Sequence, residues 1–457
     1  MIYLGNINKF KFDLIAVLLL LFLTPLFFFK LGQSSLVSFD EAWYGDIARN
    51  IINSRDFINL TWNGNLYIDH PPAGFWVVAI SEKIFGESEF GVRFAPAFLG
   101  LVSLVVIYFL GKELFNRWVG LSSAIALSSS FWFLFRARSG NLDIILTFFF
   151  LLTLLLGVKV SKEKQFLWPF FISLAFLLLT KTLVPFAIIP ALIIIFWKPK
   201  YSWKEIRWPA AFLVGILLFW LVNQLLKNSM FLQHYFNIGL PGVDVETNYL
   251  ENIKLVKEYL HSGIGKWFWP GIFSVISGLF LRKKSFLMFS AFFFSFLLPA
   301  IFSTKVHIWH LIPLHPILIL SFFGLSFVIL ERVIKNKSVA GILILAICLY
   351  ISILQWKIAW NQFIDIPSFV SDEAILSKEA GKYSYPLFID GDFVQSAVFY
   401  SRKDVSQIQA RGLKEIFEQK NKVVIITYQW RLDQEKIPVG SYKIIKKDRD
   451  KILIEAK

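Results

Sequence analysis

Apolar stretches long enough to cross a lipid bilayer recur throughout this sequence and restrict what it can fold into. A helix of about 20 apolar residues covers the roughly 30 Å of hydrocarbon in a bilayer. Hydrophobic residues make up 56% of the chain, and the stretches are too many to share one soluble core. We therefore predict an α-helical, multi-pass membrane protein with about eleven membrane-spanning helices. The stretches are residues 12–31, 94–111, 118–135, 143–158, 166–180, 183–197, 209–226, 267–281, 285–302, 311–331 and 338–356.

Basic residues between these stretches assign the two sides of the membrane. They gather in every second connection, and short loops rich in Lys and Arg stay in the cytoplasm. The first outer loop, residues 32–93, instead contains eight acidic and four basic side chains. This alternation predicts a cytoplasmic N-terminus and an extracytoplasmic C-terminus. Because many of the basic residues behind the net charge of +15 lie in such loops, we expect membrane lipids and no nucleic acid as partners.

Three long segments lie on the predicted outer side, namely residues 32–93, residues 227–266 and the tail. In the first, residues 41–53 place apolar side chains at helical spacing, which predicts an amphipathic helix on the bilayer surface. The tail alternates strand-like stretches, PLFIDGD and KVVIITYQ, with helical stretches, SAVFYSR and GLKEIFEQ, and ends in a predicted β-hairpin. We therefore predict a membrane domain at residues 1–356 and a small soluble α/β domain at residues 357–457.

Two carboxylates stand just beyond the first predicted span, in the stretch SFDEAWYGDIARN. Ser38 and Glu41 have the spacing of a capping box, in which each side chain bonds the backbone N–H of the other residue. Asp40 falls in the first helical turn, where the helix dipole favours an anion. Helix capping and the helix dipole by themselves explain both carboxylates. The inference that Asp40 is functional therefore rests on the other polar residues predicted on the same side of the membrane.

Further reactive side chains occur in other outer connections of the predicted topology. The double proline in YIDHPPAGFW stiffens the chain after an aspartate and a histidine. The stretch FRARSGNLD opens a span with an aspartate, which is costly in lipid. The structural alternatives are a turn, arginines that reach the interface from span ends and an aromatic belt. Their shared side favours one outer-face site, made of Asp40, Asp69, His70, Arg136, Arg138, Asp143, Lys181, Lys305, His307 and His310.

The residue types in this set suit group transfer from a lipid phosphate. Bases at the membrane surface bind anionic headgroups, and carboxylates can abstract a proton or bind a divalent cation. His307 and His310 have no third ligand nearby in the sequence, so we do not predict a zinc site. No GxxxxGK[ST] loop occurs, so the energy of transfer would come from the donor. No cofactor is firmly indicated, and a divalent cation is the one candidate.

Six pieces of the sequence, in this order, resemble the GT-C membrane glycosyltransferases. The nearest branches are the protein O-mannosyltransferases and the lipid A aminoarabinose transferases. The pieces are DEAWYGDIARN, YIDHPPAGFW, FGVRFAPAFLG, RARSGNLD, LTKTLVP and STKVHIWHLIPLHP, within residues 35–330. The resemblance implies a polyprenyl-phosphate sugar as donor and a site on the outer face of the membrane.

Residue roles follow from this resemblance. Asp40 matches the family's essential aspartate of the first loop, and Asp143 matches a second acidic position. Lys305 lies where the family often has a lysine close to the donor phosphate. Asp69 and His70 stand where the aminoarabinose branch usually has Glu-Lys, which leaves the sugar and the acceptor open.

The resemblance predicts a glycosyltransferase that moves a sugar to a lipid, glycan or protein acceptor by an inverting single displacement. Asp40 and Asp143 would be the catalytic residues, and the other eight residues of the set would bind the donor phosphate or substrate. A transporter or flippase without chemistry is the alternative, but it predicts charges within the spans. A receptor or scaffold that binds a partner through its tail would leave the loop residues without a purpose.

Overall fold

The protein is described by a computed structural model that covers residues 2–198, 200–239, 249–302, 307–391, 393–408, 412–419 and 421–456. By its internal contacts the chain divides into two compact units. The first unit comprises residues 1–30, 68–74 and 95–366, and the second comprises residues 31–67, 75–94 and 367–457. The predicted boundary at residue 356 stays a prediction, and the contacts group the first outer loop mainly with the tail.

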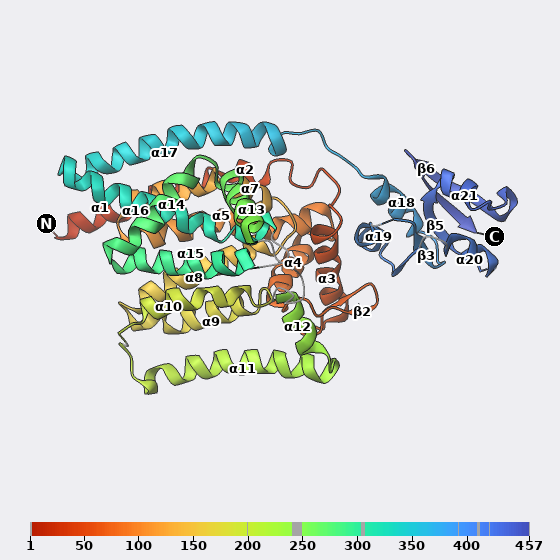
Figure 1. The fold of residues 1–457 in the computed structure, drawn as a ribbon, viewed down its shortest axis with the longest axis horizontal. Coiled ribbons are helices and arrows are strands. Elements are labelled where there is room, and N and C mark those ends of the chain that lie inside the picture. Colours follow the sequence, from red (N-terminus) through yellow and green to blue (C-terminus); the bar gives the residue numbers. More distant parts are fainter. Residues whose placement is uncertain are drawn as a thin grey trace. The chain divides into compact units, whose positions relative to one another are not determined.

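The first unit contains helices and no strands among its described residues (Figure 1). Its helices are α1 (Ile2–Leu21), α2 (Thr24–Phe28), α6 (Arg117–Ser128), α7 (Phe131–Ala137), α8 (Asp143–Val160), α9 (Leu167–Leu178), α10 (Ile189–Ile195), α11 (Trp203–Lys227), α12 (Phe231–Gly239), α13 (Tyr249–Ile264), α14 (Phe268–Leu281), α15 (Lys284–Phe302), α16 (Leu314–Ile334) and α17 (Lys337–Ala359). Short helical turns add η1 (Lys164–Phe166), η2 (Val184–Ile188), η3 (Gly265–Trp267), η4 (Ile308–Leu311) and η5 (Trp360–Ile364). Two more helices, α4 (Ala73–Phe85) and α5 (Glu89–Leu114), run from one unit into the other.

The apolar helices confirm a multi-pass membrane protein, whereas the count of eleven spans is not confirmed. Among the described residues, eight helical segments are long and apolar enough to cross a bilayer, and the pair α6–α7, bent by 69°, would be a ninth. The predicted spans 166–180 and 183–197 coincide with shorter apolar helices, Lys164–Leu178 and Val184–Ile195. At 1.5 Å per residue, these two helices fall short of the roughly 30 Å of hydrocarbon.

Small residues let the helices of the first unit approach one another closely. A Cβ added to Gly271 on α14 would lie 2.8 Å from the Cβ of Leu318 on α16. A Cβ added to Gly111 on α5 would lie 2.7 Å from the Cα of Gly120 on α6. Close backbone packing of this kind drives helix association in membranes, where lipid competes for apolar side chains. The pairs α8–α9 and α10–α15 also pack together, and Figure 1 shows these helices side by side.

The second unit is an α/β structure. From the first outer loop it takes α3 (Asp40–Ser54), β1 (Thr61–Trp62), β2 (Asn65–Leu66) and most of α4. The tail adds α18 (Asp372–Ala380), β3 (Leu387–Ile389), α19 (Val394–Ser401), β4 (Val405–Gln407), α20 (Gly412–Glu418), β5 (Val424–Tyr428), α21 (Gln429–Gln434), η6 (Val439–Ser441), β6 (Tyr442–Asp448) and β7 (Lys451–Ala456). The four strand and helix stretches predicted in the tail and its final hairpin are therefore confirmed.

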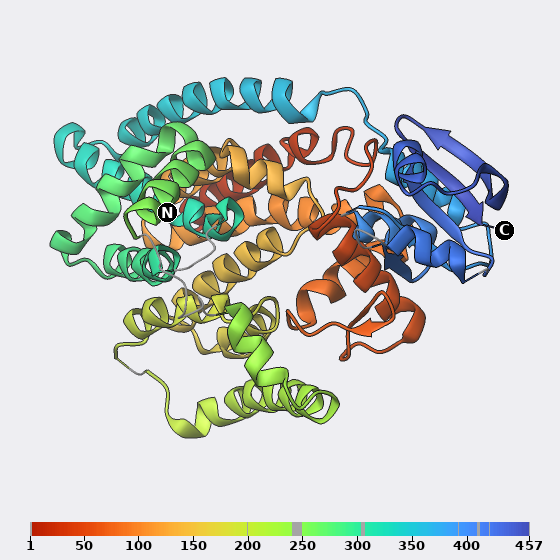
Figure 2. The same cartoon turned by 45° about the vertical axis from the view of Figure 1, so that its right-hand side comes forward.

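A five-stranded sheet organises the tail, with the strand order β4-β3-β5-β7-β6. Figure 2 shows strands of this sheet in blue, close to the C-terminus. β3 is parallel to β4 and β5, whereas β7 is antiparallel to β5 and β6. The central strand β5 is buried on both faces. Ile425 belongs to a core with Leu413 of α20, while Val424 and Ile426 belong to a second core with Ala397 of α19. This pattern is typical of a strand covered by helices on both sides.

The predicted amphipathic helix of the first outer loop is present as α3, but its apolar face is covered by protein. Ile47 and Ile51 are 0% and 1% exposed. α3 packs on α19 of the tail, where Arg49 Nη1 donates to the carbonyl of Phe399 at 2.8 Å. Packing within the second unit therefore explains the hydrophobic periodicity that we interpreted as a bilayer-surface helix.

Candidate active site

A buried carboxylate with two cationic partners lies in the first unit. Asp143 Oδ2 accepts a hydrogen bond from Arg136 Nη2, and its Oδ1 accepts one from Lys181 Nζ, both at 2.6 Å. The three side chains, which we call the Asp143 cluster, are nearly enclosed, since the residues are 2%, 8% and 9% exposed for Asp143, Arg136 and Lys181. The cluster has one negative and two positive formal charges, so it suits an additional anion.

The local sequence explains how the cluster forms. Arg136 stands at the end of α7 and Asp143 at the start of α8, with a sharp turn between them. Asn141 organises this turn, because its Oδ1 accepts from the backbone N–H of Asp143 at 2.9 Å and its Nδ2 donates to the carbonyl of Arg136 at 2.5 Å. Lys181 follows α9 and reaches Asp143 from the other side.

Aromatic side chains near η4 cover the cluster. The Arg136 guanidinium lies 5.2 Å from the centre of the Trp309 ring, within range of a cation–π contact. His307 stacks on Trp309 with ring centres 4.6 Å apart and lies 5.3 Å from His310. His310 in turn interacts electrostatically with Asp143. The predicted His307 and His310 thus gather beside the cluster, whereas Lys305 lies outside the described residues.

Asp69 and His70 are held in place by Thr182. The Thr182 hydroxyl donates to the carbonyl of Asp69 and lies 2.7 Å from His70 Nδ1, so it accepts from an Nδ1–H. Burial among protein atoms, and then the nearby charge of Lys181, lower the pKa of His70 to about 3. His70 is therefore uncharged at neutral pH and acts through hydrogen bonds. Its role in binding the donor phosphate or substrate stays a prediction.

His234 on α12 is a polar partner that sequence reasoning missed. Its Nε2 lies 2.7 Å from Oδ1 of Asp69, across 165 positions of the chain. The only sequence signal is a histidine on an amphipathic helix in the second outer segment, residues 227–266. Such a signal does not identify a partner.

Arg138 has a different task from Arg136. Its Nη1 donates to the carbonyl of Leu26 at 3.0 Å and its Nη2 to the carbonyl of Phe29 at 2.7 Å. These carbonyls lie at the end of α2, where helical carbonyls lack partners within the helix. Arg136 and Lys181, and not Arg138, pair with Asp143 in this structure.

Asp40 belongs to the second unit, at the first position of α3, and is partly exposed. The convergence of Asp40 with the Asp143 cluster, which belongs to the first unit, stays a prediction.

The predicted capping box before α3 is wrong. Phe39 is the residue before the helix, with φ of 69°, and the Ser38 hydroxyl donates to Gln395 instead. Glu41 Oε2 accepts from the backbone N–H of Val37 at 2.8 Å, and its two oxygens accept from Arg93 at 2.8 Å each. A buried arginine with charged and backbone partners outcompetes the local serine contact, because charge-assisted bonds are about twice as strong as neutral ones.

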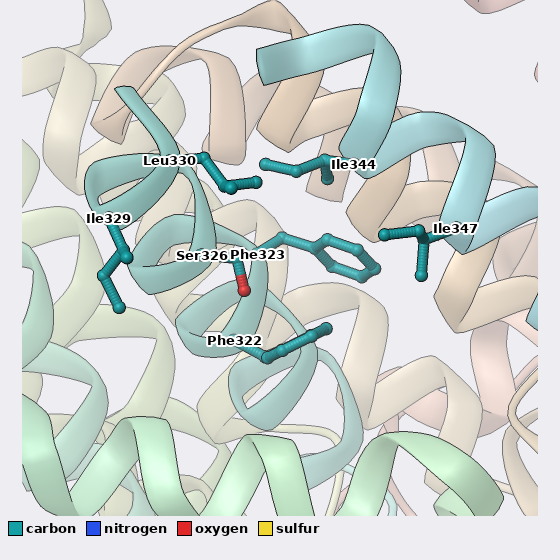
Figure 3. Close-up of a pocket in the computed structure, with 7 residues that line it drawn as sticks. All are labelled: Phe322, Phe323, Ser326, Ile329, Leu330, Ile344 and Ile347. Carbon is teal, nitrogen blue, oxygen red and sulfur yellow. The ribbon is translucent and has the colours of Figure 1, made fainter. Parts of the chain in front are cut away.

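The described residues contain no group of three or more His, Cys, Asp or Glu side chains arranged to hold a metal ion. An apolar groove of about 240 Å³ lies between α16 and α17 (Figure 3). Its lining residues are Phe322, Phe323, Ser326, Ile329, Leu330, Ile344 and Ile347. This lining is apolar except for Ser326 and contains no titratable side chain.

Parts of the chain match known sequences. Residues 69–225 match the family described as dolichyl-phosphate-mannose-protein mannosyltransferase. This range contains the Asp143 cluster and the Asp69–His70 pair, but it begins after Asp40 and ends before His234. An uncharacterized protein of Aquifex aeolicus is 33% identical over 48% of this chain and 44% of its own length. The undecaprenyl phosphate-alpha-4-amino-4-deoxy-L-arabinose arabinosyl transferase of Shewanella sediminis is 37% identical over 26% of this chain and 22% of its own length.

The fold matches along nearly the whole chain. ArnT from Cupriavidus metallidurans in the apo state has a TM-score of 0.71 and 14% identity, with 99% of this chain and 98% of ArnT covered. The chain has a GT-C glycosyltransferase fold. The same TM-score relates it to ArnT bound to undecaprenyl phosphate. The predicted fold class, a GT-C helical membrane protein with a small α/β part, is therefore confirmed. At this identity the structural likeness shows the GT-C fold alone, and the matched sequence segments cover less than half of the length of the two curated relatives.

Proposed function

We propose that this protein is a glycosyltransferase that takes a sugar from a polyprenyl-phosphate donor. The observation that carries this proposal is the Asp143 cluster, in which two buried cations share one carboxylate at the start of an apolar helix. Because the site has a surplus of positive charge, the phosphate of a membrane lipid would complete its charge balance. The relatives named as undecaprenyl-phosphate arabinosyl transferases support this donor class.

Within this proposal, Asp143 serves mainly to hold Arg136 and Lys181 in place. Both of its oxygens already accept bonds from these cations, so it is poorly suited to take a proton. Arg136 and Lys181 bind the donor phosphate and stabilise the charge that develops as it leaves. Because a polyprenyl phosphate is a good leaving group, the reaction needs no general acid.

Asp40 is proposed as the base of the reaction. It takes the proton of the acceptor while the acceptor atom forms a bond to the anomeric carbon, and the bond from this carbon to the phosphate oxygen breaks. The transition state resembles an oxocarbenium ion, and a single displacement inverts the anomeric centre. The proposal places the reaction at the periplasmic face of an inner membrane, with a cytoplasmic N-terminus. The acceptor is a lipid, a glycan or a protein, and a divalent cation is an optional addition.

The test is a transfer assay with purified protein in lipid nanodiscs. Undecaprenyl-phosphate pentose, hexose and amino-sugar donors are offered without ATP, together with an envelope extract as acceptor source. We expect release of undecaprenyl phosphate from at least one donor and a loss of more than tenfold in Lys181→Ala. The control is Lys162→Ala, a lysine whose side chain is 50% exposed and pairs with Glu113. Wild-type protein that neither binds undecaprenyl phosphate nor consumes any donor would overturn the proposal.

A further inference from the structure

His234 and Asp69 form a contact that the proposed chemistry does not use. The two residues are 165 positions apart, and His234 Nε2 lies 2.7 Å from Asp69 Oδ1. Both belong to the first unit. The side chains are 43% and 28% exposed for His234 and Asp69, so the pair borders space that a ligand can enter.

The position of His234 is set by aromatic packing on its own helix. Phe231, which is 1% exposed, and Tyr235 lie on either side of His234 in α12. Both rings pack against Trp220 of α11, with ring centres 5.6 and 5.7 Å away. This packing anchors the turn of α12 from which His234 reaches Asp69.

Asp69 is fixed at two points. Thr182 donates to its backbone carbonyl, and His234 holds Oδ1 of its side chain. Among the described residues, no hydrogen bond reaches the other carboxylate oxygen, Oδ2. The backbone anchor and the His234 contact together determine where Oδ2 points, so a substrate group would meet an acceptor with a defined direction.

Asp69 also lies beside the cationic site. It precedes His70, which shares Thr182 with it and interacts electrostatically with both Lys181 and Asp143. A ligand whose phosphate binds the Asp143 cluster would therefore bring the group next to that phosphate, the donor sugar, toward Asp69. A carboxylate oxygen accepts hydrogen bonds from sugar hydroxyls or from an amino substituent.

We propose that His234 is a positioning residue that orients Asp69 to bind a hydroxyl or amino group of the donor sugar. The inference rests on the proposed function, because it needs a sugar donor held by its phosphate. It adds α12, from the second outer segment, to the parts of the chain that select the sugar.

The proposal separates recognition of the sugar from recognition of the phosphate. Removing the imidazole leaves the backbone of Asp69 anchored by Thr182 but frees its carboxylate to rotate. Since a hydrogen bond to a charged group typically contributes a factor of roughly 10 to 100, His234→Ala should raise KM for the donor about tenfold or more. The turnover number should change little, because this contact is made in the ground state as well as in the transition state.

The experiment measures binding and turnover in the full-length protein in nanodiscs. The variants are His234→Ala, His234→Gln, whose amide can still donate to Asp69, and the control Gln233→Ala, an exposed neighbour on α12. Binding of undecaprenyl phosphate without a sugar is compared with binding of an undecaprenyl-phosphate sugar. Donors with only hydroxyls and donors with an amino group are assayed side by side, and the larger loss identifies the group that Asp69 binds.

We expect His234→Ala to weaken binding of the sugar-bearing donor while undecaprenyl phosphate binds as before, with partial rescue in His234→Gln. Equal loss of both ligands, or no loss of either, would overturn the role of His234. A wild-type protein that binds neither ligand would instead refute the proposed function, so the two failures are distinguishable.

Discussion

Lys181 and Arg136 approach opposite oxygens of Asp143, each at 2.6 Å, although Arg136 lies at the C-terminal end of α7 and Lys181 follows the C-terminal end of α9. One carboxylate therefore neutralises only part of the charge that two buried cations bring. Removing one partner from such a group costs more stability than the intact group contributes, because a buried charge is left without compensation.

Asp143→Asn should lower the free energy of unfolding by about 3–5 kcal/mol, because it leaves Arg136 and Lys181 buried without their counter-charge. The double variant Asp143→Asn/Lys181→Met should lose less than Asp143→Asn alone, since one of the two stranded cations is gone. Thermal unfolding in detergent micelles measures both. Purely additive losses would show that the three side chains do not act as one charge cluster.

Asp40→Asn should abolish sugar transfer while leaving thermal stability close to that of the wild type. Glu41→Gln, one position along, should instead lower thermal stability more than sugar transfer, because Glu41 forms two bonds with the buried Arg93. Transfer assays and unfolding curves on the two variants provide the comparison. A well-folded and active Asp40→Asn protein would remove Asp40 from the role of base.

Glu82 should make the second unit less stable as the pH rises. It is 2% exposed, and neither of its carboxylate oxygens has a hydrogen-bond partner among the described residues. Burial, reinforced by Glu87 and Asp46, raises the pKa of Glu82 well above its usual 4.5. The folded protein therefore keeps a proton that the unfolded chain releases, so the stability contributed by Glu82 is complete below pH 4.5 and declines as pH rises toward the folded pKa.

Glu82→Gln should remove this decline and stabilise the protein at neutral and alkaline pH, since glutamine does not titrate. Unfolding curves at a series of pH values measure how steeply the free energy of unfolding changes with pH. Glu415→Gln, an exposed glutamate on α20, is the control and should keep the wild-type slope. If Glu82→Gln also keeps it, Glu82 is not the titrating group.

His70 should act in the opposite direction on the acid side. Its pKa is lowered from 6.5 to about 3 in the folded protein, so the unfolded chain binds a proton first as the pH falls. The stability contributed by this group is complete above pH 6.5 and is lost between pH 6.5 and about 3. His70→Gln should flatten this part of the curve, whereas the exposed His261→Gln should leave it steep. An unchanged slope in His70→Gln would show that the pKa of His70 is the same in the folded and unfolded states.

The predictions from sequence succeeded where the deciding forces are local. Hydrophobic length predicted a chain of apolar helices, and the apolar run KVVIITYQ predicted the strand that the structure shows as β5. The Ser38–Glu41 spacing misled for a related reason. A capping box is a local pattern, but Arg93, 52 positions from Glu41, offered the stronger partner.

The sequence by itself determined the membrane class, the apolar character of the helices, the main strand and hairpin stretches of the tail and the residue types of the candidate site, because burial periodicity and turn chemistry act over a few residues. Only the tertiary structure decided which charges share a carboxylate, that His70 is neutral and that His234 meets Asp69. These outcomes depend on distances between segments far apart in the chain and on how little water reaches them. The spacing of neighbouring residues in the sequence does not determine either quantity.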